Sequence, residues 1–127
     1  MSWQAYVDSS LVGTHKIDKA AITSRAGDST WASSTGFTLS PTEMKALAAG
    51  FDNADGIQGN GVHVHGVKYL TLRADDRSIY AKQGKEGIVC VRTKQAILLG
   101  HYDENTQPGE ATKVVEALAD YLLGVGF

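Results

Sequence analysis

The residues with reactive or metal-binding side chains are few, and their spacing does not predict an enzyme. His63 and His65 are two residues apart in a segment of strand-like alternation, so both should point to one face of a strand. Two histidines on one face are compatible with metal binding, but no third ligand lies near them in the sequence. Asp75 and Asp76 fit a turn better than a pair of catalytic carboxylates. We therefore expect a half-exposed strand face and a turn, with no metal site.

Cys90 and the glycine-rich segment 56–61 also have simpler explanations than chemistry. Cys90 stands between two valines in a strand, the usual setting of a small buried thiol. The segment 56–61 does not fit the dinucleotide-binding fingerprint, and the chain has no Walker motif. The sequence thus predicts no catalytic residue, no cofactor and no enzymatic activity.

Aromatic side chains at the chain ends are better candidates for function, because they could form a binding surface. Trp3 and Tyr6 lie on one side of a predicted helix, and Val7 and Leu11 continue one turn further round it. Val7 and Leu11 would then hold the helix to the core and leave Trp3 and Tyr6 available beside Tyr121. Periodicity alone favours the plainer alternative, in which all four side chains of this helix belong to the core.

Composition bounds the class of protein. A length of 127 residues suffices for a single domain, residues 1–127. The lone cysteine, together with the lack of an apolar leader before Trp3, leads us to expect a reducing cytosol, and no apolar run is long enough to span a membrane. The net charge of −2 gives no general attraction to nucleic acid. The segment 68–94, however, carries seven basic residues against three acidic ones, a pattern usual for a solvated sheet edge.

Local signals predict three helices. Ser2 is a plausible N-cap for the first, which should end near Gly13. The motif 40–43, Ser-Pro-Thr-Glu, predicts a second helix with a capping box that ends near residues 50–52. Pro108 begins the third, which should end at Gly124. Residues 53–61 contain three glycines and are interpreted as a surface loop.

Strand signals fill most of the remaining chain. Residues 16–26 and 30–35 should form a hairpin, and five short strands should follow over 62–65, 67–73, 77–82, 87–92 and 95–102. Their close spacing leaves no room for crossover helices, so the strands should be antiparallel. The helices must bury their apolar stripes against this sheet. We therefore expect an α+β fold with a central antiparallel sheet of about six to seven strands and helices on its faces.

Four segments taken together resemble the profilin family, and most of all its fungal branch. They are 2–8, 24–28 with the following Trp31-Ala32, 72–80, and 109–122, and they span essentially the whole chain in the expected order. The resemblance implies that the N- and C-terminal helices pack side by side on one face of the sheet, with a further helix on the other face.

The resemblance also implies a site for proline-rich partners, such as formins, between the terminal helices. A polyproline II helix presents pyrrolidine faces and free carbonyls, which suit aromatic rings and the indole N–H or phenol O–H. The family often ends in Tyr, whereas the final residue here keeps the ring and lacks the hydroxyl. The residues carried over are Trp3, Tyr6, Trp31, Tyr121, Leu122 and Phe127.

The same resemblance implies a monomer that binds monomeric actin, regulates its polymerisation and speeds its nucleotide exchange, as a cytoplasmic, cytoskeleton-associated protein. The site would combine the basic part of the sheet with the start of the last helix: Lys68, Arg73, Arg77, Tyr80, Lys94, Gly109 and Lys113. Arg73 and Arg77 would also meet phosphoinositide head groups. The alternative is a small-ligand-binding or lipid-binding α+β domain with no role on actin, in which the terminal aromatics are merely core.

Overall fold

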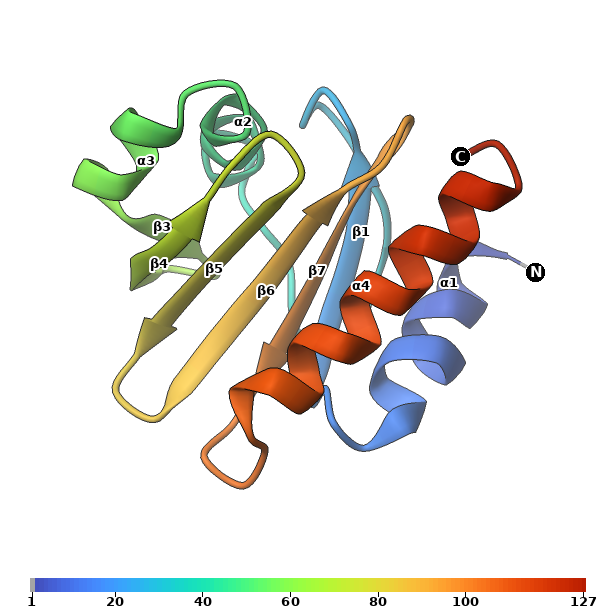
Figure 1. The fold of residues 1–127 in the computed structure, drawn as a ribbon. Coiled ribbons are helices and arrows are strands. Elements are labelled where there is room, and N and C mark those ends of the chain that lie inside the picture. Colours follow the sequence, from blue (N-terminus) through green and yellow to red (C-terminus); the bar gives the residue numbers. More distant parts are fainter. Residues whose placement is uncertain (1) are drawn as a thin grey trace.

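The structure is a computed structural model that describes residues 2–127. Its centre is a seven-stranded antiparallel sheet with the order β2-β1-β7-β6-β5-β4-β3 (Figure 1). The strands are β1 (Lys19–Ser24), β2 (Thr30–Ser33), β3 (Val62–Val64), β4 (Val67–Ala74), β5 (Ser78–Gln83), β6 (Glu86–Arg92) and β7 (Ala96–Tyr102). The predicted α+β fold with a central antiparallel sheet is confirmed.

The helices form a layer on each face of the sheet. They are α1 (Trp3–Ala5), continued by a π-helix (Tyr6–Leu11) and a 3₁₀ turn (Val12–Thr14), then α2 (Pro41–Gly50), α3 (Ala54–Asn60) and α4 (Pro108–Gly124). We call residues 3–14 the N-terminal helix. It lies beside α4 on one face of the sheet, and α2 and α3 lie on the other side (Figure 1). The two terminal helices run antiparallel, so the first and last turns of the chain meet.

Two hydrophobic cores flank the sheet. On one face, Val7 and Leu11 of the N-terminal helix pack with Val115 and Leu122 of α4. On the other face the core is formed by α2, α3 and the opposite sides of the strands. The pairing of β1 with β7 joins the first hairpin to the later strands, so each core continues from the hairpin onto those strands. Val7 and Leu11 are fully buried, as their predicted anchoring role requires.

The N-terminal helix begins as the sequence predicts and then widens. The Ser2 hydroxyl accepts a hydrogen bond from the Ala5 N–H at 3.1 Å and so caps the first turn. The π-helix that follows places Tyr6, Val7 and Leu11 on the buried side together. The helix ends just after Gly13, where His15 adopts a left-handed conformation with φ of 63°.

The expected loop at residues 53–61 is wrong, because it contains the helix α3. The Asn53 side chain caps this helix by accepting from the Gly56 N–H at 3.2 Å, and Ile57 is buried in the core beneath it. Glycines weaken the helical signal in the sequence, but tertiary burial of one apolar residue outweighs that low propensity. The first strand is also shorter than the predicted 16–26.

Helix α2 carries the predicted capping box. Ser40 and Glu43 exchange hydrogen bonds of 2.9 and 3.1 Å, and Pro41 begins the helix. The Glu43 carboxylate also accepts from the N–H groups of His65 and Gly66, at 3.1 and 2.8 Å. Since both of these residues have positive φ, they form the two-residue turn between β3 and β4. One carboxylate thus fixes a helix start and a hairpin turn.

Candidate functional site

An aromatic surface forms where the two ends of the chain meet. Trp3 is its centre: its ring centroid lies 4.9 Å from that of Trp31, 5.4 Å from that of Phe127 and 5.7 Å from that of Tyr6. Tyr6 in turn lies 6.3 Å from Tyr121 across the seam between the terminal helices. Five of the six predicted proline-binding residues are therefore in one continuous cluster, which we call the aromatic surface (Trp3, Tyr6, Trp31, Tyr121 and Phe127).

Hydrogen bonds from three distant parts of the chain hold this surface in place. The Gln4 side-chain amide donates to the Ser33 carbonyl at 3.0 Å and fixes the N-terminal helix to β2. The Phe127 carbonyl accepts from the Gln95 N–H at 2.7 Å and from the Thr93 hydroxyl at 2.8 Å. The C-terminal segment is thus attached to the β6–β7 turn, and the Phe127 ring is directed onto Trp3.

Exposure divides these residues into ligand-accessible rings and supports. Tyr121 is 55% exposed and Phe127 38% exposed, and both tryptophans are half-buried. Tyr6 is only 8% exposed, so it offers an edge and not a face. Leu122 is fully buried within the core. Its predicted role as a ligand contact is therefore wrong, because it lies beneath the aromatic surface and supports it.

The tyrosine pair at the seam is polar as well as aromatic. Burial, followed by the neighbouring Tyr121 hydroxyl, raises the pKa of Tyr6 above its usual value, so the Tyr6 phenol is protonated near neutral pH. A protonated phenol can donate a hydrogen bond, as can the indole N–H of each tryptophan. The surface therefore combines flat apolar faces with hydrogen-bond donors, which suits a ligand with apolar rings and unpaired carbonyl acceptors.

The basic sheet face is more neutral than its sequence indicates. Arg77 donates to the Glu116 carboxylate from Nε at 3.1 Å and from its terminal nitrogen at 2.9 Å. The same terminal nitrogen contacts the Asp120 carboxylate at 2.8 Å. Arg77 therefore attaches the β4–β5 turn to α4, and its nomination for actin and phosphoinositide binding stays a prediction.

Glu116 is the centre of this polar cluster. Besides Arg77, its carboxylate accepts hydrogen bonds from the hydroxyls of Ser78, at 2.7 Å, and Tyr80. Burial, and then the hydrogen bond to Glu116, raises the pKa of Tyr80. The guanidinium of Arg73 lies 5.4 Å from the centre of the Tyr80 ring and forms an ion pair with Asp75 at 2.9 Å. Both arginines nominated for anionic lipid thus already have carboxylate partners.

The other residues nominated for actin do not share one location. Lys68 is exposed on β4, whereas Gly109 and Lys113 are exposed near the start of α4. Lys94 is in the β6–β7 turn, next to Gln95 and the attachment of Phe127. It therefore lies at the opposite end of α4 from Gly109, beside the aromatic surface.

Sequence reasoning missed an apolar patch on β4. Leu70 is 65% exposed and Leu72 60% exposed, although both are large aliphatic residues. Lys82 stands directly across from Leu70 in the β4–β5 register, so the patch has a basic border. We call Leu70 and Leu72 the β4 patch. Its signal in the sequence was the presence of apolar residues on both faces of a strand, because Tyr69 on the opposite face is buried.

The candidates for metal chemistry do not assemble into a larger ligand group within the described residues 2–127. No group of three or more histidine, cysteine or acidic residues that could hold a metal ion occurs within residues 2–127. Cys90 is completely buried, and burial raises the pKa of its thiol, so it is protonated and unreactive. None of the helices formed by residues 2–127 is long and apolar enough to cross a membrane.

These features define a class: a small α+β domain that displays an aromatic surface between its terminal helices and a second, part-apolar surface on its sheet. Comparison with known proteins specifies it further. The profilin family model matches residues 1–127, so the chain belongs to the profilin family. Profilins are actin-binding regulators of the cytoskeleton.

Individual relatives match along their whole length. The profilin of Schizosaccharomyces pombe is 63% identical over all 127 residues of both chains, and that of Saccharomyces cerevisiae is 58% identical over the same span. A structure of the S. pombe profilin superposes with a TM-score of 0.97, covering 99% of this chain and 100% of that one. Mouse profilin IIa, solved in complex with a double repeat from the FH1 domain of mDia1, shares the fold with a TM-score of 0.82 over 100% of both chains, at 22% identity.

Proposed function

We propose that this protein binds proline-rich segments at the aromatic surface and monomeric actin at the sheet face beside α4, and that it thereby regulates actin polymerisation. The observation that carries the proposal is the convergence of five aromatic rings, four from the chain ends and Trp31 from β2, of which Tyr121 and Phe127 are substantially exposed. Isolated exposed aromatics are common, but a connected set held by backbone hydrogen bonds is typical of a recognition surface.

The chemistry of the surface fits a polyproline II helix. Such a helix is already extended before binding, so it loses little conformational entropy when it docks. Its pyrrolidine rings can stack on the faces of Trp3 and Tyr121, and its carbonyls can accept from the indole and phenol donors. The complex of mouse profilin IIa with FH1 repeats supports this proposal by analogy. Formin-like proteins with proline-rich segments are therefore the proposed partners.

The proposed actin-binding face is the β4 patch with its basic border. Leu70 and Leu72 provide apolar area, and Lys68 and Lys82 provide positive charge at its edge. An apolar centre with a charged rim is the usual anatomy of a protein interface. Family membership supports the assignment to actin. Faster nucleotide exchange would follow if the complex favours an open state of actin, which is a population shift in the partner.

Phosphoinositide binding through Arg73 and Arg77 stays a prediction that the geometry does not favour. A phosphate group would have to displace Asp75 from one arginine, and Glu116 and Asp120 from the other. Lys68 and Lys82, which form no ion pair within the described residues 2–127, are better placed to attract anionic groups.

The experiment is a titration of decaproline monitored by intrinsic fluorescence, since Trp3 and Trp31 are the only tryptophans and both lie in the surface. We expect saturable binding, weakened at least about tenfold by Tyr121→Ala, because a central aromatic anchor contributes about 2 kcal/mol or more. The control is Thr42→Ala, at an exposed position of α2 on the opposite face of the sheet, and it should bind decaproline normally. Equal affinity of Tyr121→Ala and the wild type would contradict the proposal.

A further inference from the structure

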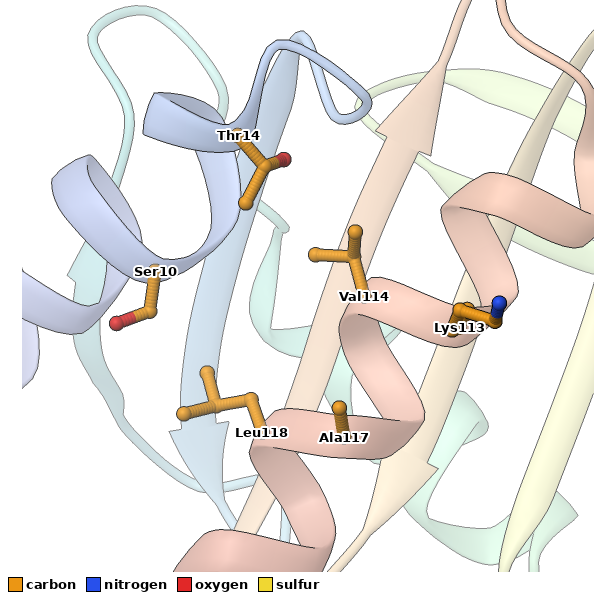
Figure 2. Close-up of a pocket in the computed structure, with 6 residues that line it drawn as sticks. All are labelled: Ser10, Thr14, Lys113, Val114, Ala117 and Leu118. Carbon is orange, nitrogen blue, oxygen red and sulfur yellow. The ribbon is translucent and has the colours of Figure 1, made fainter.

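The seam between the terminal helices continues beyond the aromatic surface as an open hollow. Two residues of the N-terminal helix, Ser10 and Thr14, line one side of it, and its volume is about 400 Å³ (Figure 2). The other side is formed by α4, through Lys113, Val114, Ala117 and Leu118. That volume falls in the range of small-ligand pockets, although the hollow is open along its length. No segment within the described residues 2–127 covers this hollow.

The hollow is aligned with the aromatic surface. Ser10 and Thr14 follow Tyr6 along the N-terminal helix, and Ala117 lies about one turn before Tyr121 on α4. Leu118 and Val114 pack in the same cluster as Trp3 and Tyr6. The two helices therefore provide one groove whose floor changes from aromatic to aliphatic along the seam.

The lining of the hollow selects an apolar occupant. The Thr14 hydroxyl donates to the Leu11 carbonyl at 2.7 Å and accepts from the Lys16 N–H at 3.2 Å, so its hydrogen-bonding capacity is used within the chain. Its methyl group points toward the space between the helices, as do the methyl groups of Val114 (Figure 2). Lys113 also lines the hollow, at its edge, and its side chain points away from the N-terminal helix (Figure 2).

We propose that this hollow is an extension of the proline-binding groove, which takes the proline or aliphatic residues that follow those on the aromatic surface. The inference rests on the proposed function, because it assigns the continuation of the same ligand. Continuity of the two surfaces along one helix pair is what identifies the occupant.

The dimensions set how far a ligand must reach. Along α4, Ala117 lies about 6 Å from Tyr121 and Val114 about 10 Å from it, at 1.5 Å per residue. A polyproline II helix rises about 3.1 Å per residue. Two residues beyond the Tyr121 contact thus reach Ala117, and three to four reach Val114. A ligand confined to the aromatic surface should therefore gain affinity when about four apolar residues are added at the end that points along the seam.

The test uses three kinds of peptide and tryptophan fluorescence. The first peptide is a hexaproline core. The second kind carries Leu-Pro-Leu-Pro added to this core, at the N-terminus in one peptide and at the C-terminus in another. The third kind carries Gly-Ser-Gly-Ser at the same two positions. One of the two Leu-Pro extensions should bind at least about fourfold more tightly than its Gly-Ser counterpart, since each buried methylene contributes about that factor.

The variant Ala117→Glu places a charged side chain in the hollow from an exposed helical position, so folding should be preserved. This variant should abolish the gain in affinity from the Leu-Pro extension and leave hexaproline binding unchanged. The control is Ala49→Glu, at an exposed position of α2 on the opposite face of the sheet, and it should keep the gain in affinity. A gain that persists in Ala117→Glu, or no gain for either extension in the wild type, overturns the extension. Failure of hexaproline itself to bind overturns the proposed function and the extension with it, and this outcome is distinct from the others.

Discussion

Glu116 provides the sharpest test of how α4 is held against the sheet. Its carboxylate accepts hydrogen bonds from Arg77, Ser78 and Tyr80, and Ser78 is almost fully buried. In Glu116→Ala the hydroxyls of Ser78 and Tyr80 lose their acceptor, and Arg77 keeps only Asp120. A buried donor left without a partner costs about 1–3 kcal/mol.

The magnitude must be discounted for solvent. The side chains of Glu116 and Arg77 are 22% and 39% exposed, so water can replace part of the lost interaction and screens the ion pair. We expect Glu116→Ala to lower the free energy of unfolding by about 2–3 kcal/mol. For a domain of this size, such a loss corresponds to a decrease in Tm of roughly 6–15 °C. Urea and thermal unfolding followed by circular dichroism measure both quantities.

A matched control separates the hydrogen-bonded cluster from simple charge removal. Asp120 is the other acidic partner of Arg77, but its side chain is 70% exposed. Asp120→Ala should therefore lower the free energy of unfolding by less than about 0.5 kcal/mol. Glu116→Ala should also move the pKa of Tyr80 toward its usual value, because one of the groups that raise it is gone. Equal losses of unfolding free energy in the two variants, or an unchanged pKa of Tyr80 in Glu116→Ala, would refute the reasoning.

Two further predictions concern stability. Burial is the main cause that raises the pKa of four tyrosines above the usual value of about 10. They are Tyr6, Tyr69, Tyr80 and Tyr102. As pH rises, the unfolded state should release these protons first. The stability that the four tyrosines contribute should therefore be fully present below about pH 10 and decline above it, less steeply in Tyr102→Phe. A flat urea-unfolding profile from about pH 9 through about pH 11 would contradict this. Gly27→Ala should be more destabilising than Gly36→Ala. Both glycines have positive φ, 75° and 77°, so the backbone conformation penalises both variants. Only at Gly27 would the new Cβ also collide with the protein, 2.5 Å from the Met44 carbonyl oxygen. We expect about 1–2 kcal/mol from the backbone conformation at Gly36 and at least about 1 kcal/mol more at Gly27, measured by urea unfolding; equal losses would rule out the close contact.

Local signals made much of the fold predictable from sequence. Ser40, Pro41 and Glu43 specify a helix start within four residues, and the structure has the predicted capping box there. Alternating strands with turns between them predict an antiparallel sheet for the same reason, since each turn is specified by a few adjacent residues. Pairing of β1 with β7 was not visible, because it joins residues about 75 positions apart and no local pattern records it.

The candidate site was predictable in its residue types and less so in its geometry. The predicted anchoring role of Val7 and Leu11 is right, but Tyr6, expected to stay available beside Trp3, is buried with them. Leu122 was misassigned because adjacent positions on α4 differ only in the direction of the side chain, and Tyr121 is exposed where Leu122 is buried. The ion pairs of Arg77 were missed for another reason: counting charges over a segment ignores acidic partners such as Glu116, which lies 39 residues away.

The central claim is that one small domain carries two independent binding surfaces, and two variants measured in two assays test it most directly. Tyr121→Ala changes the aromatic surface, and Leu72→Asp changes the β4 patch; both residues are more than half exposed, so both variants should fold. Each is assayed for decaproline binding by tryptophan fluorescence and for sequestration of monomeric actin by sedimentation. We predict that Tyr121→Ala loses decaproline binding and keeps actin sequestration, and that Leu72→Asp does the reverse. Loss of both activities in either folded variant, or of neither, would contradict the account.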